Sequence, residues 1–299
     1  MMGAELAAID PTTGRDAWLA ERRKGIGASE APAALGLSPY QTPFGLWCLK
    51  TGAVPPAEET EAMRWGSRLE PVLAEAFAES TGLEIARSQV FRRHDGRPHL
   101  LATADGLTAD GDLVELKTIS AFKAGELGED GTDELPDHWL VQAQQQMYVF
   151  GRPLVRFGVL VGGQRFRTYT VHRDDALLDA ILPKLDRFWS QVTSNTPPEA
   201  TGRDAATLAS LRPSEGTRVE LASPLLPGVA SEYEEAGRLI RQLEEDRRAL
   251  KARLIEAMGD AAVATLLDGR EVVRKVIDRK GFTVEPGQYV DFRIRSPKA

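Results

Sequence analysis

Cysteine is almost absent from this chain, which has a single one, Cys48, among 299 residues. No disulfide can form within such a chain, and no set of cysteines is available to ligate an iron–sulphur cluster. His94 and His99 have no partners at the spacing of a zinc site. These absences exclude a disulfide-stapled secreted domain and favour a reducing compartment, so we expect a cytoplasmic protein.

Long hydrophobic runs are also missing. No stretch approaches the roughly 18–20 consecutive apolar residues that a membrane span requires, and residues 1–13 lack the basic start and apolar run of a secretory signal. With 42% hydrophobic and 27% charged residues, the composition is that of a globular protein with a substantial core. We therefore expect no membrane partner.

Positive charge is in deficit, and the net charge is −7. Because nucleic-acid affinity depends on Lys and Arg contacts with phosphate, this sum is unfavourable for a DNA-binding protein. The acid is concentrated at Glu126–Glu134 and in the C-terminal third, whereas locally basic stretches lie at Arg15–Lys24 and Arg87–Arg97. A basic groove can coexist with an acidic remainder, so the net charge neither supports nor excludes DNA binding.

Helical and extended patterns alternate through the first two thirds of the chain. The periodicity of apolar residues predicts strands at 84–91, 100–108, 113–119, 155–161 and 165–172. It also predicts a helix–turn–helix arrangement over 16–50 and helices at 60–81 and 137–150. This order predicts an α/β (α+β) fold with a small mixed central sheet flanked by helices.

A domain boundary is predicted near Asn195–Pro198. We expect a core domain over residues 1–198, a linker over 199–228 and an extension over 229–299. The extension combines a helix at Glu232–Met258 with strands at 262–267, 271–278 and 289–294. The leucine stripe of this helix either packs on its own domain or pairs with a neighbour, and it has too few heptads to predict a coiled coil.

A hairpin carries the clearest chemical signal. In its second strand Glu115 and Lys117 point to one face, because side chains two residues apart share a face. Whether Asp105 joins them depends on register. A two-residue turn would place Asp105 opposite Leu116, on the wrong face, whereas a three-residue loop with Gly111 in the left-handed conformation would place it opposite Glu115. We predict the three-residue loop.

Converging carboxylates on Asp105 and Glu115 would form a hard oxygen site suited to Mg²⁺. Such an ion lowers the pKa of a bound water and neutralises charge on a scissile phosphate. Lys117 could position or deprotonate that water, and Glu70, on the preceding helix, could reach the ion. The alternative is a surface hairpin with an ordinary Glu–Lys pair, because an isolated pattern of this kind often arises by chance.

Further motifs surround the hairpin in a fixed order. They are Trp18, Arg22, Gly25–Glu30, Leu35–Tyr40, Thr42–Pro43, Leu46–Trp47 and Lys50–Gly52, then Trp65–Gly66 with Glu70, Asp105–Leu107, Glu115–Thr118, and Gln142–Gln144 with Met147–Tyr148. Together they resemble the YqaJ viral recombinase family, relatives of phage lambda exonuclease within the PD-(D/E)XK nuclease superfamily. The resemblance covers about residues 15–195, and five ordered blocks are far more specific than any one.

The resemblance implies roles for the catalytic residues. Asp105 and Glu115 match the metal-binding carboxylates of the family, the main-chain carbonyl of Leu116 matches a further ligand, and Lys117 matches the catalytic lysine. Glu70 matches the helix-borne acid near the metal. The implied cofactor is Mg²⁺, for which Mn²⁺ can substitute.

The resemblance also implies DNA-binding roles. Arg22 and Ser29 match residues that hold the 5′ phosphate of a DNA end, and Gln142 matches a glutamine beside the site. Thr103 stands where a serine is usual and keeps a hydroxyl, so we group it with the DNA-binding residues. One departure is Ala104, which stands where the superfamily has proline, a residue that shapes the turn without taking part in the chemistry.

Each DNA-binding candidate also has a plain structural reading. Arg22, next to two further basic residues, could simply be a solvated helix end. Ser29 could be an N-cap, the common role of serine before a helix. Gln142 is one of four glutamines in a short segment, most of which are expected to face water.

The family resemblance implies a Mg²⁺-dependent exodeoxyribonuclease that resects one strand of linear double-stranded DNA, 5′ to 3′, for phage-type homologous recombination. It implies double-stranded DNA ends and a single-strand annealing protein as partners, a toroidal homotrimer, and the cytoplasm of a bacterial host with a phage or prophage. Two other functions stay open. One is an endonuclease or flap-repair nuclease on the same core, and the other is a catalytically silent DNA-binding assembly protein.

Overall fold

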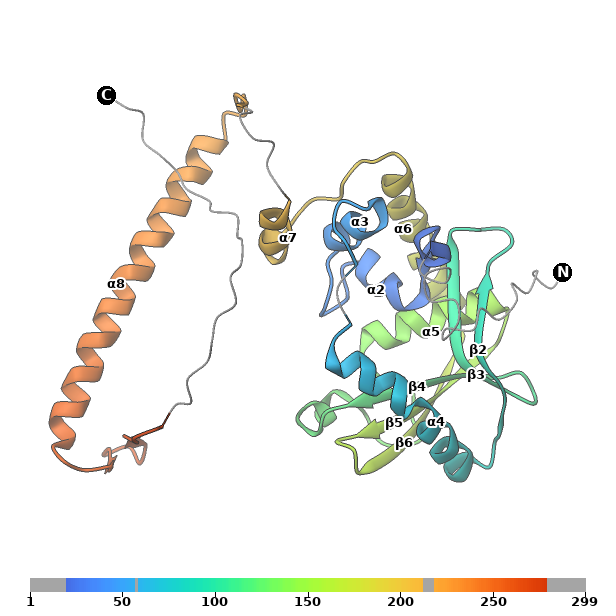
Figure 1. The fold of residues 1–299 in the computed structure, drawn as a ribbon, viewed down its shortest axis with the longest axis horizontal. Coiled ribbons are helices and arrows are strands. Elements are labelled where there is room, and N and C mark those ends of the chain that lie inside the picture. Colours follow the sequence, from blue (N-terminus) through green and yellow to red (C-terminus); the bar gives the residue numbers. More distant parts are fainter. Residues whose placement is uncertain (1–19, 57–58, 212–217, 279–299) are drawn as a thin grey trace. The chain divides into compact units, whose positions relative to one another are not determined.

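The computed structural model of the chain describes residues 20–56, 59–211 and 218–278. The chain divides into two compact units, residues 1–211 and 212–299 (Figure 1). The division lies inside the linker expected at residues 199–228. Trp18 and the strand predicted at residues 289–294 fall outside the described residues.

The first unit is built on a six-stranded mixed sheet with β1, β3, β4, β5 and β6 in that order and β2 paired with β3. The strands are β1 (Ile26–Gly27), β2 (Ile85–Arg93), β3 (Leu100–Thr108), β4 (Leu113–Ile119), β5 (Leu154–Val161) and β6 (Arg165–His172). β1 runs parallel to β3, and β4 runs parallel to β5, while the other pairs are antiparallel. The small mixed sheet predicted from the sequence is confirmed.

One edge of β3 is divided between two partners. β2 pairs along nearly all of β3, from Arg93 opposite Leu101 to Ile85 opposite Thr108, and so occupies one edge. On the other edge β1 pairs at residues 100–101 and β4 at residues 106–107. Among the described strands none pairs with residues 102–105 on that edge, which leaves a gap in the sheet.

Helices cover both faces of the sheet. They are α2 (Ala31–Ala34), α3 (Pro43–Thr51), α4 (Glu61–Thr81), α5 (Asp137–Phe150), α6 (Asp175–Thr193) and α7 (Ala205–Ser210), with short 3₁₀ segments η1 (Ala28–Glu30), η2 (Ala121–Glu126) and η3 (Gly202–Asp204). α5 packs in the larger core with Phe157 of β5, whereas α4 packs on Val114 and Leu116 of β4. Because successive residues of a strand face opposite ways, α4 and α5 lie on opposite faces.

Local sequence sets the helix ends. The Thr42 and Thr60 side chains accept hydrogen bonds from the amides of Gly45 and Met63, at 3.0 and 3.2 Å, and so cap α3 and α4. Gly82 ends α4 with φ +71, a left-handed conformation that favours glycine. The helix α6 is not among the elements predicted from the sequence, although its polar and apolar residues alternate with helical periodicity.

The end of the first unit is tied to its beginning by Asp204. This residue is 1% exposed, and its carboxylate accepts hydrogen bonds from the Thr42 hydroxyl and from the amide and hydroxyl of Thr201. Burial raises the pKa of Asp204, but these hydrogen bonds outweigh it and lower the pKa below its usual value. The charged carboxylate therefore stabilises the folded unit.

The second unit consists of a long helix and a hairpin, as predicted. α8 runs from Leu226 to Met258 and begins six residues before the expected Glu232, and the strands β7 (Val263–Thr265) and β8 (Glu271–Val273) pair antiparallel. Both strands are shorter than predicted. No helix in the described part of the chain has the combined length and hydropathy that a membrane span requires.

We expect Asp204→Ala to lower the free energy of unfolding by about 2 kcal/mol near neutral pH, because hydrogen-bonding groups at Thr42 and Thr201 lose a charged acceptor. The folded pKa is lowered, so this stabilisation is present above the unfolded pKa and is lost as the pH falls through the folded value. Denaturant titration at several pH values measures it, with the exposed Glu199→Ala as control. Equal stability of the two variants at neutral pH would contradict the anchoring role.

Candidate functional site

The β3–β4 hairpin has the predicted register. Gly106 lies opposite Val114 and Leu107 opposite Leu113, so the next step along the strands brings Asp105 opposite Glu115. The connecting loop is three residues long. The Thr108 amide closes it by donating a hydrogen bond to the Asp112 carbonyl at 3.0 Å. Gly111 has φ +82, the left-handed conformation expected there. The structure thus confirms that the two carboxylates share a face.

Asp105 ends the pairing of the two strands. Its Oδ2 accepts a hydrogen bond from the Leu116 amide at 2.7 Å, where a continuing ladder would use the carbonyl of Ala104. Burial and the nearby charge of Glu115 raise the pKa of Asp105 well above its usual value. A carboxyl group in this setting is stabilised in its charged form by any cation that binds beside it.

Lys117 points at the same carboxylates. Its Nζ lies 2.5 Å from Oε1 of Glu115 and donates to Oε1 of Gln142 at 3.2 Å. Burial lowers the pKa of Lys117, but the charges of Glu115 and Asp105 outweigh it and raise the pKa. Lys117 is therefore a cation in this arrangement, which suits contact with a phosphate oxygen.

Two glutamines of α5 hold the Glu115 carboxylate, which is 4% exposed. Gln142 donates to Oε1 of Glu115 and Gln146 donates to Oε2, each at 2.6 Å. Gln146 also donates to the Thr103 carbonyl at 2.8 Å. The expectation that most glutamines of this helix face water is wrong, because Gln142, Gln144, Gln145 and Gln146 are all buried. Gln146 was missed, although its i+4 spacing from Gln142 places both on one helical face.

Glu70 lies on α4 and bonds to Gln89 of β2, whose amide nitrogen donates to Glu70 Oε1. Burial raises the pKa of Glu70, the Gln89 hydrogen bond lowers it, and the charge of Glu115 raises it further, with a net increase. Gln89 has φ +53, a conformation that is uncommon outside glycine and costs free energy. The sequence gives no signal for this residue, since its neighbours have ordinary strand character.

One cavity of about 190 Å³ contains nearly all of these groups. It opens where the edge of β3 has no strand partner, and its polar lining consists of Arg22, Ser29, Gln89, Thr103, Asp105, Glu115, Lys117 and Gln142. Glu70 adjoins this lining through Gln89. The structure therefore brings Asp105, Glu115 and Lys117 together with the predicted DNA-binding residues, although these positions are up to 120 apart in the sequence.

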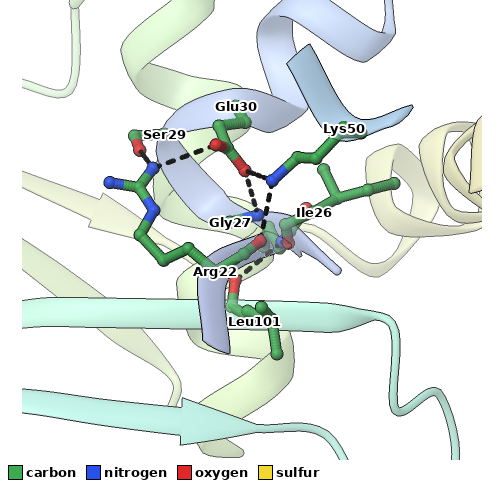
Figure 2. A network of polar contacts seen from close by, with 8 residues as sticks. Arg22, Ile26, Gly27, Ser29, Glu30, Lys50 and Leu101 are labelled. Atoms are coloured by element: carbon green, nitrogen blue, oxygen red, sulfur yellow. Dashed lines mark hydrogen bonds and ion pairs between the residues drawn. The ribbon is translucent and has the colours of Figure 1, made fainter. Parts of the chain in front are cut away.

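The two residues predicted to hold phosphate touch each other. Arg22 Nη2 donates to the Ser29 hydroxyl at 3.2 Å and lies 3.3 Å from Oε1 of Glu30 (Figure 2). Ser29 lies within η1, whose N-cap is Gly27, so the reading of Ser29 as an N-cap is wrong. Its hydroxyl is directed to Arg22. Glu30 and its second partner, Lys50, were not predicted as site residues.

The oxygen donors fit a hard divalent cation. Asp105 and Glu115 supply carboxylates at the end of a strand pair, and Mg²⁺ takes one or two protein carboxylates with water and phosphate oxygen. Burial first, and the negative charge of Glu115 second, raise the pKa of Asp105, and a cation bound beside Asp105 would offset both effects. Within residues 20–56, 59–211 and 218–278 no three acidic, histidine or cysteine side chains are grouped so that they could hold a metal ion. Glu70 therefore does not form one cluster with Asp105 and Glu115.

Comparison with known proteins agrees with the resemblance. The family model of the YqaJ-like viral recombinase domain matches residues 17–153. The uncharacterised protein YqaJ of Bacillus subtilis (strain 168) is 37% identical over 208 residues, which cover 68% of this chain and 64% of that protein. The aligned region thus spans slightly less than two thirds of the relative.

A solved structure has the same fold. The alkaline exonuclease LHK-Exo from Laribacter hongkongensis matches with a TM-score of 0.50 and 22% identity, over 65% of this chain and 100% of that chain. The predicted fold class is confirmed. Residues 17–153 of this chain therefore match the YqaJ-like viral recombinase domain, and the chain is similar to YqaJ of Bacillus subtilis.

Proposed function

We propose that the protein is a metal-dependent exonuclease that resects one strand of linear double-stranded DNA from its 5′ end and exposes single strand for homologous recombination. The observation that carries the proposal is the single cavity in which Asp105, Glu115 and Lys117 adjoin Arg22 and Ser29. A hydrolytic site with an anion site in the same cavity is suited to a substrate whose terminal phosphate lies close to the bond that is cut.

Mg²⁺, or Mn²⁺ in its place, would be held by Asp105, Glu115 and the Leu116 carbonyl, with Glu70 nearby. When bound, the ion would supply an activated water and neutralise charge on the phosphate. Lys117, as a cation, would hold the phosphate or the attacking water. Gln142 and Gln146 would keep both oxygens of Glu115 in place, because each oxygen accepts an amide hydrogen bond.

Arg22 and Ser29 would bind the 5′ phosphate of a DNA end. A guanidinium and a hydroxyl 3.2 Å apart present several donors at one point, and arginine is well suited to phosphate because its donors are fixed in a plane. Thr103 would contact the DNA from the adjacent wall of the cavity.

The family resemblance also supports the wider setting of this activity. We extend the proposal to a ring-shaped homotrimer around DNA, to cooperation with a single-strand annealing protein, and to action in the cytoplasm of a bacterial host that carries a phage or prophage.

Asp105→Ala and Lys117→Ala should each lower the rate of digestion of linear duplex DNA by about a hundredfold or more, because each removes charge stabilisation at the reacting phosphate. Digestion assays with Mg²⁺ and with a chelator measure this. Asp110→Ala removes an exposed carboxylate from the loop of the same hairpin and is the matched control. Unchanged activity of both site variants, with DNA binding retained, would place the chemistry elsewhere.

Linear duplexes with 5′-phosphate ends should be digested at least about tenfold faster than those with 5′-hydroxyl ends, since a charge-assisted hydrogen bond contributes about 1.5–3 kcal/mol. Arg22→Ala should abolish this preference, whereas Arg23→Ala, at the exposed neighbouring position, should retain it. Efficient cutting of covalently closed circular duplex would instead identify an endonuclease.

A further inference from the structure

Lys50 is a buried cation that the proposed chemistry does not use. Its side chain is 2% exposed, and burial lowers its pKa while the charge of Glu30 raises it, with a net decrease. Burying an ammonium group costs free energy that an apolar side chain of the same length would avoid. The last turn of α3 favours a cation, but that effect does not require the ammonium group to be buried.

Glu30 links Lys50 to the proposed phosphate site. Its Oε2 lies 2.7 Å from Nζ of Lys50 and accepts the Gly27 amide at 2.7 Å, while its Oε1 lies 3.3 Å from Nη2 of Arg22. Lys50 also donates to the main-chain carbonyl of Arg22 at 2.8 Å. Both ends of Arg22, its backbone and its guanidinium, are thus fixed by one ion pair (Figure 2).

The charges of this trio add up to a cationic site. Arg22 with Glu30 alone is neutral, and a neutral pair attracts phosphate weakly because the carboxylate cancels the guanidinium. The ammonium of Lys50 balances Glu30 from the buried side, so the group of three keeps one net positive charge. The more exposed member, Arg22, is the one that lines the cavity.

We infer that Glu30 and Lys50 are positioning residues that hold the Arg22 guanidinium in place for a 5′-terminal phosphate. Together they also keep the net charge around Arg22 positive. The inference rests on the proposed function of Arg22 and Ser29. Neither Glu30 nor Lys50 touches the reacting atoms; both act through Arg22.

Gly27 offers a way to disturb this arrangement without changing any charge. A methyl group there would lie 3.2 Å from Glu30 Oε2 and 3.3 Å from Arg22 Nη2, closer than ordinary contact. The backbone of Gly27 has φ −67, which alanine adopts readily, so Gly27→Ala displaces side chains and leaves the backbone unstrained.

The test is the ratio of digestion rates of the full-length protein on duplexes with 5′-phosphate and 5′-hydroxyl ends. In Lys50→Met, Glu30→Gln and Gly27→Ala this ratio should fall by about tenfold, because small misplacements of a binding group reduce rate strongly. The rate on hydroxyl ends should stay within about twofold of the wild-type rate, which also shows that each variant is folded. In the Arg22→Ala background the same substitutions should have no further effect on the ratio.

The outcomes separate the two claims. If the wild type prefers 5′ phosphate and the preference survives in Gly27→Ala and Lys50→Met, the positioning role is overturned and the proposed function stands. Equal loss of rate on both kinds of end, or effects that add to Arg22→Ala, also overturn it. A wild type that does not distinguish the two ends overturns both claims.

Discussion

The site depends on the separation of β4 from β3 after two paired residues. The carboxylate of Asp105 accepts a hydrogen bond from the Leu116 amide at 2.7 Å. A side-chain oxygen thus replaces the main-chain carbonyl that would accept this bond in a continuing strand pair. Because the pairing ends there, a stretch of β3 edge stays open next to two carboxylates. The cavity lined by Asp105, Glu115 and Lys117 occupies this opening.

An open sheet edge inside a protein leaves polar groups that require partners. The glutamines of α5 meet this requirement: Gln145 donates to the carbonyls of Ile26 and Leu101 at 2.8 and 2.9 Å, and Gln146 donates to that of Thr103. Gln146 uses the same amide nitrogen to hold Glu115. The amide of Gln146 thus pairs a main-chain carbonyl of the open β3 edge and also orients the Glu115 carboxylate. The same contact contributes to the stability of the fold and to the geometry of the site.

The sequence predicted the parts of the site that depend on local rules. Strand alternation placed Glu115 and Lys117 on one face, and turn chemistry at Gly111 placed Asp105 beside them. It could not predict Gln89, whose φ of +53 has no sequence signature, or the link from Lys50 through Glu30, because that contact joins segments 20 residues apart through tertiary packing. The buried glutamines were misjudged for the same reason, since polarity alone does not reveal an unpaired strand edge. The helix α6 was missed and the fold class was confirmed.

One cavity should hold both the metal-binding carboxylates and the site for a 5′ phosphate. A crystal structure of the Lys117→Ala variant with Mn²⁺ and a 5′-phosphorylated duplex would show where each of them binds. We expect an anomalous manganese peak next to Asp105 and Glu115, with the terminal phosphate bound to Arg22 and Ser29. Manganese bound away from these carboxylates, or a DNA end seated outside this cavity, would contradict it.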